Sequence, residues 1–517
     1  MSSEKSGQRP AARFAVNATS SVLTMLISIT GLVWVNQYLL RRISPEEYAL
    51  IPVLASLMIF AEFFRIIFTR GLSRFMVEAD ARGDDDEVTR IVSSMLPVLG
   101  AVALTLCAVG MIVVWQIDQV INVAPEYVRE ARIMFTLLIL ALALGIFTTP
   151  LCAGLYVKMR FVVLNLVNLG TEGLRVVLLF TLLLGVSTQV LWVTVAASVA
   201  TLANISVRIG YTWRILPAAR FRLSHVSLVT VRRLLGFSLW TAVQGFNQFA
   251  QRAAPALFLN RFSTALDVAS FHLGNLPNQQ IRRLIQAAGG PATPELTAIF
   301  ATEGEGAMQA FYYRGGRYYL WGALFLPPPF IIYAAQLIEL YVGATYALAA
   351  PVMITLFLLY PFNWASAMFY QIAYAIGRIR AYNITSVALS IAALIGMYIF
   401  IVELGMGAMG AAYGLSGGFI LVQLVLIWPM GLRLVKGSHV VFLRETLVPG
   451  LMPFLAALGG CWAFSEIVEV NSWLRFGIGC IVSAIVYVTM LGAGCLNSED
   501  RALAARAVKT VRRKIGL

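Results

Sequence analysis

Long apolar segments alternate with short polar segments along nearly the whole chain. A helix that crosses the hydrocarbon core of a bilayer needs about 20 mostly apolar residues. By that criterion the pattern predicts fourteen membrane-spanning helices, and we expect the first to be a retained span rather than a cleaved signal. The predicted spans are 15–40, 47–68, 91–115, 131–156, 161–186, 190–214, 233–259, 266–288, 317–340, 347–374, 382–402, 406–430, 447–467 and 473–495.

Two halves of the chain repeat at a nearly constant spacing. The segment YLLRRIS at 38–44 is similar to LFLNRFS at 257–263, which lies 219 residues later. Other pairs at spacings of 219 or 220 are Gly71 and Gly290, Tyr127 and Tyr346, Met134 and Met353, Lys158 and Arg378, and Arg160 and Arg380. Because this spacing contains an even number of predicted helices, both halves have the same orientation. Parallel repeats around a central cavity are a common design of secondary transporters.

We therefore expect an all-α integral membrane protein with 14 transmembrane helices, arranged as two parallel six-helix repeats plus two extra C-terminal helices. The expected parts are an N-terminal lobe at 1–214, a cytoplasmic linker at 215–232, a C-terminal lobe at 233–431, helices 13 and 14 at 447–495, and a basic amphipathic cytoplasmic tail at 496–517.

Composition supports the membrane assignment. The chain has 517 residues, of which 59% are hydrophobic and 12% charged, and its mean hydropathy is +0.79. Soluble globular proteins have about 45–50% apolar and about 25% charged residues. The five cysteines are scattered and there are only three histidines, so we expect neither a disulfide framework nor a metal or other cofactor.

Charge fixes the predicted orientation. Most lysines and arginines fall on the face that holds both termini, and such a bias places that face in the cytoplasm. The net charge of +14 therefore needs no nucleic-acid partner. In the tail, Leu503, Ala507, Val511 and Ile515 recur at helical spacing among basic residues. This pattern favours a helix lying on anionic headgroups, and the alternative is a solvated tail.

The arrangement of six, six and two spans resembles a known family. A polar segment, PELTAIFATEGE at 294–305, follows span 8, and SRFMVEADARGDD at 73–85 is its counterpart after span 2. Together these features resemble the Wzx-type polysaccharide flippases of the MOP exporter superfamily. The resemblance implies rocker-switch transfer of an undecaprenyl-diphosphate-linked oligosaccharide to the periplasmic leaflet of the bacterial inner membrane, for surface polysaccharide biosynthesis. It also implies contact with membrane lipids and association with other polysaccharide-assembly membrane proteins.

The span at 161–186 carries two charges, Glu172 and Arg175. A charge at the centre of a span costs about 2.5–3.5 kcal/mol on insertion scales, so such residues usually face a cavity or a partner. Three residues apart, they are neighbours on one helical face. One interpretation is an intrahelical ion pair that serves insertion alone. The other is that Arg175 contacts a substrate anion while Glu172 orients it or carries a coupling proton.

Span 7 contains a stripe of amides at helical spacing, which suits sugar hydroxyls because an amide both donates and accepts hydrogen bonds. The same stripe would also suit hydrogen bonding between helices. The candidate sugar contacts here are Gln244, Asn247, Gln248 and Gln251, with Asn17 in a milder stripe on span 1. Arg252 follows the stripe and is a candidate anion contact or a residue that snorkels to the interface.

Span 8 reads FHLGNLPNQQIRRLI, with Pro277 expected to loosen the helix. Asn275 and Asn278 are candidate sugar contacts. Arg282 and Arg283 point about 100° apart on a helix, so one of them is expected to face the cavity and bind phosphate oxygens. Snorkelling to headgroups is the alternative. For Arg65 and Glu62 on span 2, snorkelling is the favoured interpretation. Arg65 is also a candidate anion contact, and Glu62 is also a candidate coupling carboxylate.

Arginines outnumber carboxylates inside the spans, which favours an anionic, sugar-bearing cargo over a cationic drug. The alternatives are a peptidoglycan-precursor flippase, a MATE-like drug exporter and, in another class, a membrane glycan polymerase or ligase. The predicted periplasmic loops are short and hold few catalytic candidates, so the sequence favours a transporter over an enzyme. There is also no phosphate-binding loop for nucleotide hydrolysis.

Overall fold

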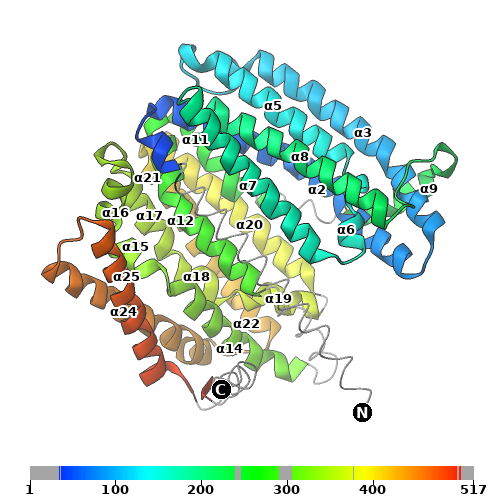
Figure 1. The fold of residues 1–517 in the computed structure, drawn as a ribbon. Helices are drawn as coiled ribbons and strands as arrows, with labels where there is room; N and C mark the ends of the chain where they lie inside the picture. Colours follow the sequence, from blue (N-terminus) through cyan, green and yellow to red (C-terminus); the bar gives the residue numbers. More distant parts are fainter. Residues whose placement is uncertain are drawn as a thin grey trace, which may run out of the picture. The chain divides into compact units, whose positions relative to one another are not determined.

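The computed structural model describes residues 34, 36–238, 246, 247, 249–289, 305–376, 378–497, 500 and 501, and the regular elements of these residues are all helices (Figure 1). For residues 60–71, inside a helix, it describes the backbone only. The chain divides into two units, at 1–269 and 270–517. Each unit is described by itself.

The first unit is built on five long helices. They are α2 (Pro45–Ala81), α3 (Asp85–Trp115), α5 (Val128–Phe147), α7 (Phe161–Gly185) and α8 (Leu191–Ile215). Shorter elements are α4 (Ile117–Val120), η1 (Pro125–Tyr127), η2 (Pro150–Cys152), α6 (Gly154–Val157), η3 (Leu223–His225), α9 (Leu228–Ser238), the π-helix η5 (Phe249–Ala253) and α11 (Ala254–Phe262). Side-chain caps fix two starts: Ser44 Oγ accepts a hydrogen bond from Glu47 N, and Asp84 Oδ1 accepts one from Glu87 N.

The predicted span at 131–156 is interrupted. It forms α5, a 3₁₀ turn that begins at Pro150, and the single turn of α6. A proline lacks the backbone N–H that a continuous helix needs, which accounts for the break. The turn folds back toward α8, where Gly154 N donates a hydrogen bond to Thr212 Oγ1 at 3.2 Å. The break therefore positions the carbonyl groups of the turn beside α8.

The interior of the first unit is apolar and joins distant segments. Met76 of α2, Ile91 and Met95 of α3, Ile146 of α5 and Leu216 after α8 are all buried in one cluster. In α7 the buried residues are Leu179 and Leu183, and the rest of the helix is half-buried or exposed.

The second unit begins within α12 (Ala265–Gly289), whose first residues belong to the first unit. Its α-helices after α12 are α14 (Glu305–Leu324), α15 (Pro327–Ile332), α16 (Ala334–Val342), α17 (Ala349–Leu358), α18 (Tyr360–Ala365), α19 (Met368–Ala375), α20 (Ile379–Met397), α21 (Gly407–Val422), α22 (Trp428–Leu434), α23 (His439–Phe442), α24 (Val448–Ile467) and α25 (Trp473–Met490). They are joined or extended by η6 (Ala344–Tyr346) and by the π-helices η7 (Tyr398–Glu403), η8 (Gln423–Ile427), η9 (Leu443–Leu447) and η10 (Leu491–Cys495).

The helix predicted at 317–340 starts earlier and is broken into α14, α15 and α16. Three consecutive prolines, Pro327, Pro328 and Pro329, open α15 and explain the division. The helices α20 and α21 pack with their backbones in close contact. Gly396, Gly414 and Gly418 leave no room for a Cβ at this crossing, so glycine is required there.

Nine helices in the described residues are long and apolar enough to cross a bilayer. They are Asp85–Trp115, Pro125–Phe147, Phe161–Gly185, Leu191–Ile215, Ala349–Ala373, Tyr382–Glu403, Gly407–Leu434, His439–Ile467 and Trp473–Cys495. The prediction of an all-helical membrane protein is confirmed in this respect. Predicted span 1 lies almost wholly outside the described residues, so the total of fourteen stays a prediction.

Candidate functional site

A cavity of about 800 Å³ lies inside the first unit, between α2, α5, α7 and α8. Its walls are mainly apolar, with Leu54 and Met58 from α2 and Met134 and Leu138 from α5. The polar lining comes from Thr148, Thr149, Arg175, Thr194, Thr201, Asn204 and Arg208. A mostly apolar pocket with a few convergent polar groups is the usual form of a ligand site.

Arg175 lies on the wall of this cavity and pairs with Glu172 on its own helix. The Arg175 Nη2 atom is 2.6 Å from Glu172 Oε2. The two side chains remain 35% and 28% exposed, so the pair is partly open to its surroundings. The ion pair is present and its cation lines a cavity, and the choice between a role in insertion alone and a role in anion binding stays a prediction.

Arg208 is a second cation in the cavity, and the sequence analysis did not select it. Its Nη2 atom donates a hydrogen bond to the backbone oxygen of Cys152 at 3.1 Å. Its Nε atom is buried without a hydrogen-bond partner in the described residues. The acceptor is available because the chain turns at Pro150 between α5 and α6. Arg208 was missed because hydropathy placed it near the end of a span, where a basic residue ordinarily snorkels.

Among the described residues that line the cavity, the two charged ones are both arginines, Arg175 and Arg208. Glu172 compensates Arg175, whereas the contact described for Arg208 is with a neutral carbonyl group. An uncompensated guanidinium in an apolar wall favours an anionic ligand, because guanidinium N–H groups match carboxylate and phosphate oxygens.

Asn204 adds an amide beside the two arginines. Its Nδ2 atom donates to Thr171 Oγ1 at 2.8 Å and lies 3.4 Å from Asn168 Oδ1. These bonds tie α8 to α7 one residue before Glu172. The cavity thus combines two cations with amide and hydroxyl groups, a set that fits a ligand bearing both phosphate and sugar.

The predicted residues of span 8 lie in the second unit, and some of them form hydrogen bonds within it. Asn278 Nδ2 donates to Asn275 Oδ1 at 2.7 Å, and both residues are buried. Tyr360 donates its hydroxyl hydrogen to the backbone oxygen of Asn278. Arg282 interacts electrostatically with Tyr360 and Tyr382, whereas Arg283 is exposed. The two arginines therefore lie in different environments, as their angular separation on the helix predicts.

In span 7, Gln251 Nε2 donates to Asn247 Oδ1 at 2.6 Å, and Arg252 is exposed on η5. Gln244, Gln248 and Asn17 lie outside the described residues. For Glu62 and Arg65 only the backbone of α2 is described.

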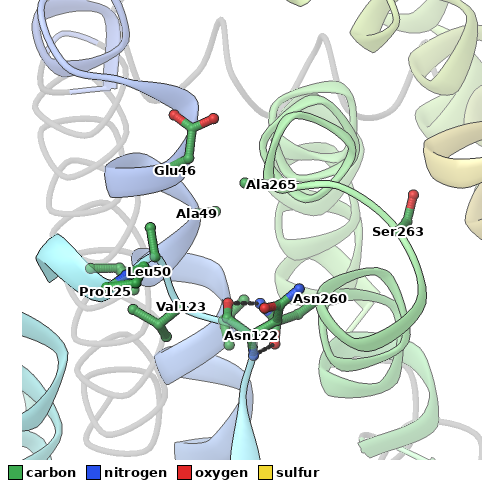
Figure 2. Close-up of a pocket in the computed structure, with 11 residues that line it drawn as sticks. Glu46, Ala49, Leu50, Asn122, Val123, Pro125, Asn260, Ser263 and Ala265 are labelled. Atoms are coloured by element: carbon green, nitrogen blue, oxygen red, sulfur yellow. Dashed lines mark hydrogen bonds between the residues drawn. The ribbon is translucent and has the colours of Figure 1, made fainter. Parts of the chain in front are cut away.

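A second, smaller pocket of about 310 Å³ lies between the starts of α2 and α12 and the turn after α4 (Figure 2). Asn122 and Asn260 meet at its edge. Asn122 N donates to Asn260 Oδ1, and Asn260 Nδ2 donates to the Asn122 backbone oxygen. The side chain of Asn260 thus satisfies both backbone groups of Asn122 and fixes α11 to this turn.

Three comparisons place the chain among known proteins. The sequence profile of one family, described as polysaccharide biosynthesis protein, matches residues 12–296. No curated protein matches the chain in sequence. Solved structures match in fold, at sequence identities that support the fold alone.

One similar structure is a multidrug resistance MATE family transporter of the MOP superfamily in an inward-facing conformation. It has a TM-score of 0.67 and 14% identity, over 80% of this chain and 96% of that one. The lipid II flippase MurJ, in an inward closed conformation, has a TM-score of 0.63 and 14% identity over 92% and 98%. A MOP superfamily transporter from Pyrococcus furiosus has a TM-score of 0.58 and 14% identity over 82% and 96%.

Proposed function

The chain belongs to the polysaccharide biosynthesis protein family, the family of Wzx-type flippases, and from that premise we propose that it flips an undecaprenyl-diphosphate-linked oligosaccharide. The cargo would move from the cytoplasmic to the periplasmic leaflet of a bacterial inner membrane, to supply surface polysaccharide biosynthesis. Both termini would be cytoplasmic, because the lysines and arginines concentrate on that face. Neighbouring polysaccharide-assembly membrane proteins would be its partners.

One observation carries the choice of an anionic cargo. Arg208 lines the cavity of the first unit with a buried Nε atom, and no carboxylate lines that cavity among the described residues. A diphosphate provides oxygens for such a guanidinium, and its negative charge offsets the cost of burying the cation. A cationic drug would instead meet repulsion from the same group.

The pair of Glu172 and Arg175 supplies an exchange step. In this structure the Glu172 carboxylate pairs with the Arg175 guanidinium at 2.6 Å. A diphosphate that enters the cavity competes for Arg175 and leaves Glu172 without its cation. Glu172 would thus be both the orienting group of Arg175 and the carboxylate that couples cargo to a proton.

The glycan would contact amide and hydroxyl groups. Asn204 and Thr201 lie in the cavity with the two arginines and extend the candidate set from the sequence. The remaining candidates stay proposals: anion contacts at Arg65, Arg252, Arg282 and Arg283, sugar contacts at Asn17, Gln244, Asn247, Gln248, Gln251, Asn275 and Asn278, and a carboxylate at Glu62.

We propose alternating access by rocking of two parallel six-helix repeats, with two additional helices at the C-terminal end. The resemblance to the family and the fold shared with MOP superfamily transporters support this mechanism. The protein would be a transporter rather than an enzyme, which the family and the fold shared with MOP superfamily transporters support.

The peptidoglycan precursor is the second candidate cargo. It is also a lipid-linked diphosphate sugar, and the fold is similar to that of a lipid II flippase. Arginine contacts to the diphosphate serve both cargoes equally. The glycan contacts must therefore distinguish them.

The test is a flipping assay with the purified protein in proteoliposomes, using a fluorescent undecaprenyl-diphosphate oligosaccharide and, separately, lipid II. Arg208→Ala should weaken cargo binding roughly tenfold to a hundredfold, the usual value of a hydrogen bond to a charged group. Arg214→Ala is the matched control, because Arg214 is an exposed arginine on the same helix and does not line the cavity.

Equal flipping by the Arg208→Ala and Arg214→Ala proteins would contradict the anion assignment. Transport of lipid II in preference to the oligosaccharide would replace the proposed cargo with the peptidoglycan precursor. Export of a cationic dye with no flipping of either lipid would reject the flippase proposal.

A further inference from the structure

The segment between α8 and α9 is held along α3 by hydroxyl groups. Thr89 Oγ1 donates to the backbone oxygen of Ala218 at 2.8 Å. Ser93 Oγ accepts from Arg222 N, and Ser94 Oγ accepts from Ser227 N, both at 2.9 Å. Three hydroxyls on two successive turns of α3 thus bind the backbone of this segment. We call residues 216–232, which include the start of α9, the linker strap.

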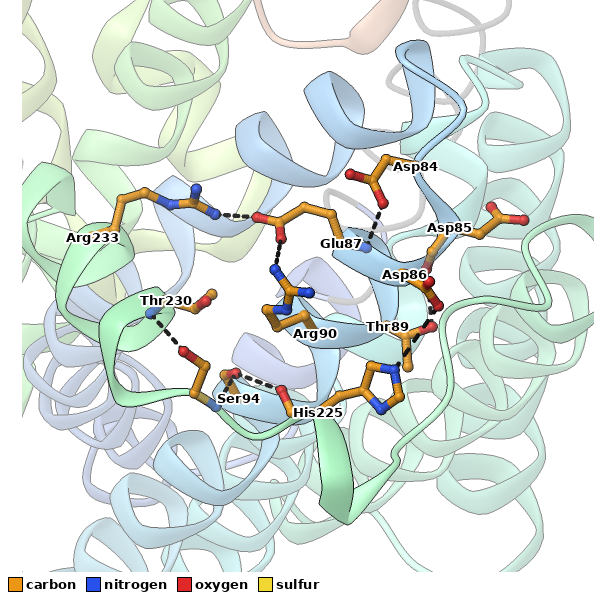
Figure 3. Close-up of polar contacts among 11 residues, drawn as sticks. Asp84, Asp85, Asp86, Glu87, Thr89, Arg90, Ser94, His225, Thr230 and Arg233 are labelled. Atoms are coloured by element: carbon orange, nitrogen blue, oxygen red, sulfur yellow. Dashed lines mark hydrogen bonds and ion pairs between the residues drawn. The ribbon is translucent and has the colours of Figure 1, made fainter.

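Acidic residues at the same end of the first unit are used in local contacts (Figure 3). Glu87 pairs with Arg90 at 3.1 Å and with Arg233 of α9. Asp84 caps α3, and Asp86 lies 3.9 Å from His225 Nε2. These contacts fix the end of the linker strap to α3, and Asp84, Asp85 and Asp86 all remain exposed.

The linker strap itself has an excess of positive charge. Arg220, Arg222 and Arg232 are exposed, and none of them forms an ion pair with another described residue. Their side chains are free to bind anions from outside the unit. The backbone bonds to Thr89 and Ser93 hold this part of the chain in place, so the arginines are presented on a fixed surface.

Large apolar side chains are exposed on the same segment. Leu223, Leu228 and Val229 have exposed fractions of 77%, 82% and 79%. Phe221 and Val226 are exposed to 45% and 41%. Because the hydroxyl bonds hold the segment on α3, these side chains do not turn inward. Apolar groups interleaved with arginines are typical of chain segments that lie in the headgroup and acyl boundary of a membrane.

We propose that the linker strap is a binding surface for anionic phospholipids of the leaflet that borders it. The arginines would contact phosphate groups, and Leu223, Leu228 and Val229 would enter the acyl boundary. The exposed apolar residues favour a lipid over a free phosphate, because a free phosphate has no acyl chain for them to contact. This surface concerns structural lipids rather than the flipped cargo, so it stands independently of the proposed function.

The test measures immersion of the strap in vesicles of defined composition. An environment-sensitive fluorophore is attached at Ser224→Cys, an exposed position, in a protein whose native cysteines are replaced. Vesicles contain phosphatidylcholine with brominated tails, with or without phosphatidylglycerol. Quenching should be stronger with phosphatidylglycerol. Each arginine removed should raise the phosphatidylglycerol fraction needed for half-maximal quenching, with affinity changing about fivefold per charge.

Two variants and one control complete the design. Arg220→Gln with Arg222→Gln, which leaves Arg232 in place, should weaken the affinity for anionic lipid about 25-fold. Leu228→Ser with Val229→Ser should reduce quenching in both vesicle types. Arg129→Gln with Arg261→Gln, exposed arginines elsewhere in the unit, should change neither. Equal quenching in the two vesicle types would overturn the proposal. A fluorescence change that appears only when a soluble protein is added would overturn it in favour of a protein partner.

Discussion

The side chain of Asn260 and the backbone of Asn122 exchange two hydrogen bonds, each 2.8 Å long. Asn260 is 8% exposed, so the pair is largely shielded from solvent. It joins α11 to the turn after α4, at the edge of the smaller pocket (Figure 2). In the proposed rocking motion Asn122 belongs to the lobe at 1–214 and Asn260 to the lobe at 233–431, so opening at this end would break both bonds.

Asn260→Ala should therefore shift the protein toward the state that is open at this end. Loss of two hydrogen bonds corresponds to about 1–3 kcal/mol, or roughly a five- to hundredfold change in the balance of states. The measurement is the rate at which a cysteine at Ala265, which lines the pocket, reacts with a membrane-impermeant thiol reagent. Asn260→Asp is the matched variant, because its carboxylate still accepts from Asn122 N. A rate unchanged by Asn260→Ala would show that the pair is not part of a gate.

The contact between Glu172 and Arg175 leads to the second prediction. Glu172→Gln removes the carboxylate and leaves Arg175 uncompensated in the cavity. Anionic cargo should then bind more tightly and leave more slowly, so the flipping rate should fall while the affinity rises. The rate should also lose its dependence on a proton gradient.

Cargo binding and flipping are measured in parallel on the same reconstituted samples, with Glu126→Gln as the control. Glu126 is an exposed carboxylate in the same unit and lies outside the cavity. If Glu172→Gln weakens cargo binding, the carboxylate does not compete with the cargo for Arg175. In that case its role is limited to insertion of α7.

Several features of the structure that depend on local sequence were predicted, whereas features that depend on contacts between distant residues were not. Apolar length predicted α7 and α8 to within a residue, because a span is decided by its own sequence. The pairing of Glu172 with Arg175 was also visible, since residues three apart on a helix are neighbours. The breaks at Pro150 and Pro327 were missed because proline was not weighed against hydropathy at these positions.

Arg208 shows why the rest of the site escaped prediction. Its role depends on the turn between α5 and α6, which brings the backbone oxygen of Cys152 to the guanidinium across 56 positions of the chain. The residues next to Arg208 in the sequence do not predict that turn. The glycines of α21 are a different case, because their four-residue spacing is visible, but only the structure shows that they meet α20.

Those glycines give the third prediction. A Cβ on Gly414 would collide with the backbone of Gly396 and Met397, and backbone cannot move aside as a flexible side chain can. Gly414→Ala should destabilise the second unit by about 1–3 kcal/mol, as overpacking does. Gly417→Ala is the control, since a Cβ there meets nothing within 4 Å. The temperature at which the detergent-solubilised protein aggregates should fall for the first variant alone. An equal fall for both substitutions would contradict the packing explanation, because a Cβ at Gly417 meets no neighbour and alanine favours a helix more than glycine does.

The fourth prediction concerns a buried ion pair between α14 and the start of the C-terminal segment. Arg317 Nη2 lies 2.7 Å from Asp500 Oδ2, and the two side chains are 5% and 2% exposed. Tyr318 also donates its hydroxyl hydrogen to Asp500, and Arg317 Nη1 donates to the backbone oxygen of Glu445. Asn497 caps this short helical stretch through two reciprocal bonds with Asp500.

Asp500→Leu alone should be strongly destabilising, by about 3–5 kcal/mol, because it leaves the Arg317 charge buried without its partner. Arg317→Met combined with Asp500→Leu should recover much of that loss, since an apolar pair of similar volume has no charge to desolvate. Limited proteolysis after residue 501 measures how firmly the C-terminal segment is held, and thermal aggregation measures the unit as a whole. Rapid cleavage in the single variant and slow cleavage in the double variant would show that Asp500 acts through Arg317. Equally rapid cleavage in both would mean that the bonds of the Asp500 carboxylate to Tyr318 and Asn497, which both variants lose, hold the segment rather than the ion pair.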